Sequence, residues 1–180
     1  MTMTSDRPTS LLALAREIAS AHPEFQAVLG PGVGDKATHA FMHQLRSQAQ
    51  KAFGADYSEK RLCGDTAFAA DFYFPEEETV VEVALGLPNP ACEFEKDILK
   101  AVMAQELGHR VRRLFFISRP GAIKKCDQPG RTAVKNWAQS KHALRVEVHE
   151  LGGEPRRRNR RRAPRSEVET GIGRRIPQLP

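Results

Sequence analysis

The sequence predicts an α/β fold in which a mixed central sheet is flanked by helices. Segments with helical apolar spacing alternate with short apolar and β-branched runs. Their order is helix, strand, strand, strand, helix, strand, helix, strand. A four-residue loop between the second and third strands is typical of a hairpin, whereas helices between the later strands are typical of parallel crossovers. At 180 residues the chain is long enough for one domain with a full core.

The first half of the chain contains two expected helices and a weak strand. Thr9 or Ser10 is placed to cap a helix that runs to about His22. Its apolar stripe is Leu11, Leu14, Ala15 and Ile18. A short turn of helix can follow at Pro23. The second helix should be capped by Asp35 and end at Gly54. Its apolar stripe is Phe41, Leu45, Ala49 and Ala52. A weak strand is expected near 59–63.

The second half should complete the sheet. A helix is expected over 91–107, followed by a strand over 111–118, whose continuous apolar run is typical of a central strand covered on both faces. A helix over 130–142 should then lead to a strand over 144–151, which alternates strictly and is expected to be half exposed. The helical spacing directs three side chains of the last helix inward: Val134, Trp137 and Ala138.

The hairpin, with strands over 67–74 and 79–86, carries one acid in each strand. A four-residue loop places Phe74 opposite Thr79, and counting back places Asp71 opposite Glu82. One face is then wholly apolar: Phe68, Ala70 and Phe72 with Val81, Val83 and Leu85. Like charges directly opposite each other destabilise a sheet, so a counter-charge such as Mg²⁺ is expected between them. The alternative is that this face is solvated and both acids are ordinary surface residues.

The order helix–strand–strand–strand–helix–strand, with an acid on each hairpin strand, resembles the PD-(D/E)xK, or restriction-endonuclease-like, nucleases. The resemblance covers roughly residues 36–118. It implies a restriction-endonuclease-like core with an added helix and strand, and phosphodiester hydrolysis of DNA. It also implies that Asp71 and Glu82 hold Mg²⁺ or Mn²⁺ as metal ligands and catalytic residues. A metal so held would polarise the phosphate and lower the pKa of its bound water.

This sequence departs from the family pattern at the expected lysine. Ala84 stands two residues after Glu82, and Ala70 stands where a proline usually precedes the first acid. In some members of the family the lysine has moved to the neighbouring helix, so Lys96 in "CEFEKDILK" is the third catalytic candidate. The acids beside it, Glu93, Glu95 and Asp97, are better explained as a solvated helix start. The alternative functions are a nucleic-acid-binding protein without catalysis and an assembly or regulatory subunit.

The chain divides into a folded domain, 1–151, and an arginine-rich tail, 152–180, which is expected to be disordered because it has almost no apolar content. Nine of the 28 basic residues and three of the 22 acidic ones lie in the tail, so the whole net charge of +6 belongs to it. Its densest part is a candidate nucleic-acid contact: Arg156, Arg157, Arg158, Arg160, Arg161 and Arg162. A second basic group follows the fourth strand and could contact phosphate or merely solvate the surface: Lys124, Lys125, Arg131 and Lys135.

Three weaker features complete the set. His39 and His43 stand at i and i+4, but without an HExxH pattern an exposed helical face is the favoured interpretation. Glu59 is a further candidate metal ligand. The cysteines, Cys63, Cys92 and Cys126, form no CxxC pair and favour a reducing compartment. No signal peptide or membrane span is evident, so we expect a cytoplasmic protein without a membrane partner. The sequence leaves the oligomeric state open, including a homodimer.

Overall fold

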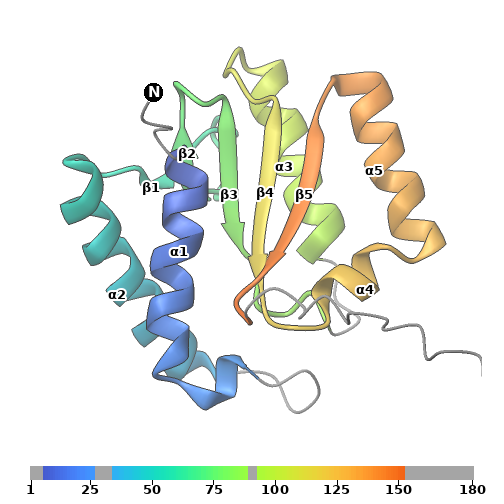
Figure 1. Ribbon diagram of the computed structural model, residues 1–180. Coiled ribbons are helices and arrows are strands. Elements are labelled where there is room, and N and C mark those ends of the chain that lie inside the picture. Colours follow the sequence, from blue (N-terminus) through green and yellow to red (C-terminus); the bar gives the residue numbers. More distant parts are fainter. Residues whose placement is uncertain (1–5, 27–33, 89–92, 153–180) are drawn as a thin grey trace, which may run out of the picture.

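The computed structural model describes residues 6–26, 34–88 and 93–152. In these ranges five strands form one sheet in the order β1-β2-β3-β4-β5 (Figure 1). The strands are β1 (Ser58–Lys60), β2 (Ala70–Phe74), β3 (Thr79–Val83), β4 (Arg113–Ser118) and β5 (Arg145–Glu150). The pairs β1–β2 and β2–β3 are antiparallel, whereas β3–β4 and β4–β5 are parallel. The expected mixed sheet is therefore confirmed.

Helices cover both faces of the sheet (Figure 1). On one face lie α1 (Arg7–Ser20) and α2 (Asp35–Phe53), and on the other lie α3 (Glu93–Glu106) and α5 (Pro129–His142). Two short elements, the 3-10 turn η1 (Pro23–Phe25) and the helix α4 (Ala122–Cys126), complete the described parts. The sequence predicted the turn at Pro23 but not α4, whose five residues are too short to show a helical period.

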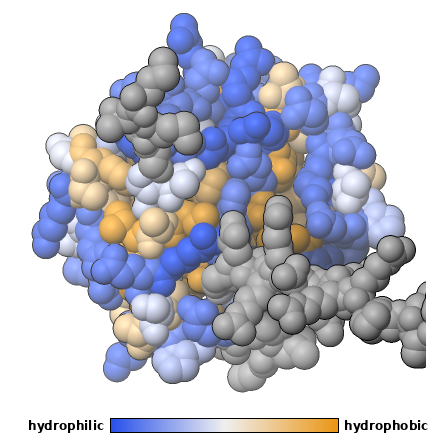
Figure 2. Space-filling view, viewed as in Figure 1, coloured by the Kyte–Doolittle hydropathy of each residue, from blue (hydrophilic) through white to orange (hydrophobic). Residues whose placement is uncertain are grey.

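The two faces have separate hydrophobic cores. Side chains of α1 and α2 pack on Phe72, Phe74, Val81 and Phe115. Side chains of α3 and α5 pack on Val80, Leu114 and Phe116 from the opposite side. Strand β4 is buried on both faces, as its continuous apolar run predicts. In the space-filling view, hydrophobic side chains gather across the middle of the α1/α2 face within a mostly hydrophilic surround (Figure 2).

The first helix begins earlier than expected. Asp6, and neither Thr9 nor Ser10, is the N-cap of α1, because its carboxylate accepts the Thr9 N–H at 3.1 Å and Pro8 is tolerated in the first turn. The second helix has Gly34 at its N-cap and Asp35 as its first residue. It ends at Gly54, which adopts a left-handed φ of +71°.

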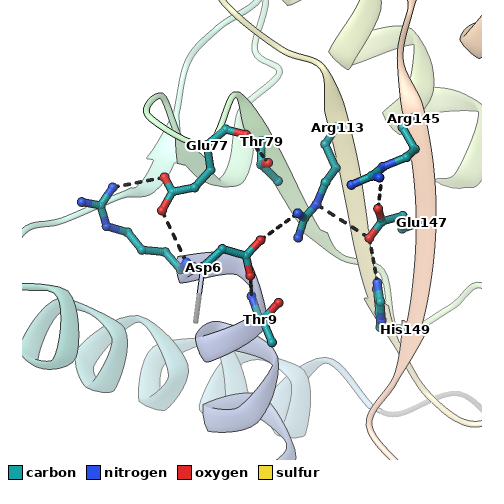
Figure 3. Close-up of polar contacts among 9 residues, drawn as sticks. Asp6, Thr9, Glu77, Thr79, Arg113, Arg145, Glu147 and His149 are labelled. Carbon is teal, nitrogen blue, oxygen red and sulfur yellow. Dashed lines mark hydrogen bonds and ion pairs between the residues drawn. The ribbon is translucent and has the colours of Figure 1, made fainter. Parts of the chain in front are cut away.

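An ionic network ties the start of α1 to the parallel strands (Figure 3). Arg113 of β4 lies 2.7 Å from Asp6 and 3.7 Å from Glu147 of β5. Glu147 also contacts Arg145 and His149, and the His149 ring stacks on Phe115 with 3.9 Å between centroids. The His149 hydrogen bond is the main cause of the lowered pKa of Glu147. The network anchors the start of α1 to β4 and β5. It does not include the hairpin acids.

The hairpin register follows the sequence prediction over its first three pairs. Phe74 pairs with Thr79, Tyr73 with Val80 and Phe72 with Val81. Three placements were wrong: Ala70 packs in the core beneath α3, Phe68 lies outside the strands and is 36% exposed, and Trp137 is 45% exposed. None of the described helices is long and apolar enough to cross a membrane.

Candidate functional site

The two hairpin acids lie where β2 and β3 stop pairing through their backbones. Asp71 Oδ2 accepts the Val83 N–H at 2.8 Å, so a side chain takes a position that a backbone carbonyl fills in a regular ladder. Because the Asp71 side chain takes the place of a backbone acceptor, Ala70 does not lie on the face of the strand that strict alternation predicts. The Asp71 side chain stays 28% exposed, whereas Glu82 is only 3% exposed. The interpretation of both acids as ordinary surface residues is therefore wrong for Glu82.

A lysine of α3 reaches Glu82 directly. The Lys100 Nζ lies 2.8 Å from Glu82 Oε1 and 2.9 Å from Asp97 Oδ1. All three side chains are less than a tenth exposed. Asp97 precedes Lys100 by three residues, so one helical face presents both groups to β3. The structure thus contains a buried triad, Glu82–Lys100–Asp97, contributed by one strand and one helix.

Lys96, the lysine that the sequence singled out, lies one helical turn earlier. Its Nζ is 3.9 Å from Asp97 Oδ1 and its side chain is 48% exposed. Lys100 contacts Glu82, and no contact between Lys96 and Glu82 is present. The sequence did contain a signal for Lys100, because the apolar Ala104 lies four residues later on the same helical face, next to Ala101 of the expected inward stripe. The solvated-helix interpretation is also wrong for Asp97, which is buried.

The electrostatics of the site are dominated by burial and by a shortage of positive charge. Burial raises the pKa of Asp71, against the lowering effect of the Val83 N–H. Burial also raises the pKa of Glu82 well above its usual value, and repulsion from Asp71 and Asp97 adds to the rise. Although burial alone would lower the pKa of Lys100, its two carboxylate partners raise it. Lys100 is therefore held as a cation by acids that it only partly compensates.

Among the described residues, the two hairpin acids border different cavities. Asp71 lines a cleft of about 350 Å³ on the α2 side, together with Arg46, Glu59 and the two histidines of α2, His39 and His43. Glu82 faces a cavity of only about 10 Å³ beneath α3, which leaves room for one water at most. The expectation that both acids lie on one face of the hairpin is therefore wrong. They are neighbours that face opposite layers.

Cys63 lies beside the triad without reactive character. Its Sγ donates a hydrogen bond to the Lys100 carbonyl at 3.3 Å, and burial raises the pKa of its thiol. Cys63 and Cys126 are both free and buried. Cys92 lies outside the described residues. A raised thiol pKa suppresses the nucleophilic thiolate form, so Cys63 acts as a packing residue.

The charge shortage is the observation that bears on a divalent cation. Three carboxylates, Asp71, Glu82 and Asp97, share the region with the ammonium of Lys100, whereas Lys96 reaches Asp97 and Arg46 reaches Asp71 only at 3.9 Å. Among the described residues, no three His, Cys, Asp or Glu side chains form a metal-binding group. Mg²⁺ commonly uses one or two protein carboxylates and completes its shell with water and phosphate oxygens. Asp71 and Glu82 supply two carboxylates, but they face opposite layers, so one ion reaches both only if the closed side at Glu82 opens.

The basic residues expected to contact nucleic acid are placed unequally. Lys124 and Lys125 lie in the last turn of α4. Arg131 of α5 is tied into the protein: its Nη1 donates to the Leu87 carbonyl at 3.2 Å and its Nε lies 3.4 Å from Glu95. Lys135 pairs with Asp127 at 2.7 Å. The six arginines of 156–162 lie outside the described residues. Arg131 is therefore a structural residue in this geometry.

Sequence reasoning missed two residues that contact the hairpin acids, Lys100 and Arg46. Both are found from the fold, because each lies on a helix that packs over one side of the hairpin. Comparison of the chain with protein-family models, with curated proteins and with solved structures gave no match.

Proposed function

We propose that the chain is a metal-dependent nuclease that hydrolyses phosphodiester bonds in DNA at Asp71, Glu82 and Lys100. The contact between Lys100 and Glu82, 2.8 Å across the α3–β3 boundary, is the observation that carries the proposal. It supplies a lysine from the helix at the acid whose own strand has Ala84 in the lysine position. This arrangement agrees with the resemblance noted for the hairpin sequence, with Lys100 in the role for which Lys96 was the sequence candidate.

The chemistry assigns a role to each side chain. A bound Mg²⁺ or Mn²⁺ would supply a water of lowered pKa and neutralise charge on the phosphate. Asp71 and Glu82 would hold that ion, and Asp71 offers its Oδ1, since Oδ2 is engaged by Val83. Lys100 places a fixed positive charge that can stabilise negative charge developing on the phosphate. Asp97 holds the Lys100 ammonium from its second side at 2.9 Å.

The arginine-rich tail gives the proposal a partner of matching charge. Its positive charge is dense enough to attract any polyanion, with an affinity that depends on salt and little on sequence. Lys124 and Lys125 add two basic side chains next to the carboxyl ends of the parallel strands (Figure 1). The partner is therefore a nucleic acid, and the resemblance favours DNA.

A second function is favoured by the closed side of the site. Glu82 is 3% exposed and its cavity has room for one water at most. A buried, mutually compensated triad is also what a protein that binds nucleic acid without cutting it, or an assembly subunit, could retain as part of its core. This alternative predicts that the triad contributes to folding and that no nuclease activity exists.

A cleavage assay on supercoiled plasmid and single-stranded DNA, with Mg²⁺ or Mn²⁺, distinguishes the nuclease from the non-catalytic alternative. The proposal expects nicking that is abolished by EDTA and by Glu82→Gln. It also expects full activity in Glu106→Gln, a control that changes an exposed acid at the end of α3. Activity on an RNA substrate alone would replace DNA as the target. If no substrate is cleaved, and circular dichroism shows that the wild type and Glu82→Gln are folded, the non-catalytic alternative remains.

A further inference from the structure

Arg46 of α2 stands at the junction of two adjoining clefts. One, of about 350 Å³, contains Asp71, and the other, of about 310 Å³, runs along α2 toward Ser47 and Gln50. Arg46 and His43 line both. The guanidinium therefore lies at the cleft that opens onto Asp71.

The contacts of Arg46 are incomplete. Its Nη2 lies 3.9 Å from Asp71 Oδ1, beyond hydrogen-bond distance, and its Nη1 contacts Glu59. Its Nε is buried and makes no hydrogen bond. Glu59 is 63% exposed and adopts φ +49°, a conformation that non-glycine residues rarely take. Arg46 is thus anchored through its Nη1, which lies 2.5 Å from Glu59 Oε1, and this leaves its Nη2 and Nε to take a new acceptor.

The oxygen that Arg46 faces is the one that Asp71 has available. Asp71 Oδ2 is engaged by the Val83 N–H, so Oδ1 is left for an external ligand. A cation held by Asp71 and the guanidinium of Arg46 therefore repel each other at this carboxylate. A phosphate group entering the cleft would offer Arg46 a new acceptor of the geometry that guanidinium prefers.

We infer that Arg46 is a substrate-positioning residue that exchanges Asp71 for a phosphate of the bound DNA strand when Asp71 takes up the divalent cation. The inference rests on the proposed function and adds the α2 cleft as the path of the strand. It predicts opposite effects on the two ligands. Removal of the guanidinium should strengthen binding of the cation and weaken binding of the nucleic acid. A residue that merely supports the fold would affect both in the same direction.

The test compares the full-length wild type with Arg46→Gln. Arg112→Gln is the matched control, because Arg112 also lies 3.9 Å from a carboxylate, that of Glu78, and is 66% exposed. Mn²⁺ binding is measured from the rise in melting temperature during a titration without DNA. Binding of a fluorescein-labelled single-stranded oligonucleotide is measured by anisotropy at saturating Ca²⁺ over a range of salt concentrations.

Arg46→Gln should need about tenfold less Mn²⁺ for the half-maximal shift, as expected for loss of a unit charge about 6 Å from a divalent ion in water. Its oligonucleotide Kd should rise about tenfold, the loss of one charge-assisted hydrogen bond, and its salt slope should fall by about 0.7. The control should match wild type. If Arg46→Gln weakens both ligands, or changes neither, the inference is overturned while the nuclease proposal stands. If the wild type binds neither Mn²⁺ nor the oligonucleotide, the inference and the nuclease proposal are both overturned.

Discussion

Replacement of Lys100 by methionine is the perturbation that most clearly separates this site from a surface ion pair. Lys100→Met keeps the length and apolar stem of the side chain but removes the ammonium between Glu82 and Asp97. Two buried carboxylates then lose the only cation in the described part of the chain that lies within 3 Å of either of them. The variant should be strongly destabilised at neutral pH.

The magnitude follows from the burial of all three groups. Breaking a buried ion pair by removing one partner costs roughly 3–5 kcal/mol, because the remaining charge is left uncompensated. For a chain of this size each kcal/mol lowers the melting temperature by about 2–4 °C, so the expected drop is about 6–20 °C. Exposed Lys96 is the matched control on the same helix, and Lys96→Met should change the free energy of unfolding by less than about 0.5 kcal/mol.

The pH dependence of the loss gives a second check. The pKa of Glu82 is already raised in the folded protein, and removal of Lys100 should raise it further. An acid whose folded pKa lies above its unfolded value contributes stability that is present below the unfolded pKa and lost as pH rises through the folded one. The deficit of Lys100→Met should therefore be small near pH 4 and grow toward pH 8.

Urea unfolding followed by far-ultraviolet circular dichroism measures both effects. A loss below about 1 kcal/mol at pH 7, or a loss that does not depend on pH, would refute the reasoning that the triad is buried and undercompensated. Addition of Glu82→Gln to the Lys100→Met background should recover part of the stability, because it removes one of the two stranded charges.

Three further predictions concern neighbouring features. Lys96→Ala should retain cleavage, because Lys100 and not Lys96 contacts Glu82; loss of cleavage with normal stability would return Lys96 to the site. The stability of the wild type should fall as pH rises above about 4, and this fall should be smaller in Glu82→Gln, as measured by melting temperature at several pH values. The same pH profile in both proteins would count against a raised Glu82 pKa. Deletion of 153–180 should leave the melting temperature unchanged while weakening DNA binding and flattening its salt dependence, and an unchanged salt slope would remove the tail from the interface.

The fold was predictable where local rules decide the outcome. The four-residue hairpin loop determines the register of Phe74 with Thr79, and the apolar run of β4 indicates a strand buried on both faces. The glycine after Phe53 ends α2 as expected. The start of α1 was missed because an aspartate cap lies ahead of Pro8, and α4 because it is shorter than two helical turns.

The site was predictable only in part, because tertiary contacts complete it. Alternation along β2 places Asp71 and Glu82 on one face, but the Asp71 carboxylate bonds the Val83 N–H and the ladder departs from alternation at that point. The motif spacing directed attention to Lys96, whereas the packing of α3 on β3 brings Lys100 to Glu82. Arg46 could not be found from sequence, because its partners Glu59 and Asp71 are distant along the chain.

The proposal that Asp71 and Glu82 hold a divalent cation is tested by calorimetry of wild type and Asp71→Asn. Burial raises the pKa of Asp71, so its charge costs stability near pH 7. Asparagine removes that charge and can still accept the Val83 N–H. The account predicts that Asp71→Asn melts at a higher temperature than wild type without metal. It also predicts that millimolar Mg²⁺ or Mn²⁺ stabilises wild type alone, since a ligand adds RT ln(1 + [L]/Kd) to the native state that binds it. A wild-type melting temperature that is unchanged by either metal would contradict the claim.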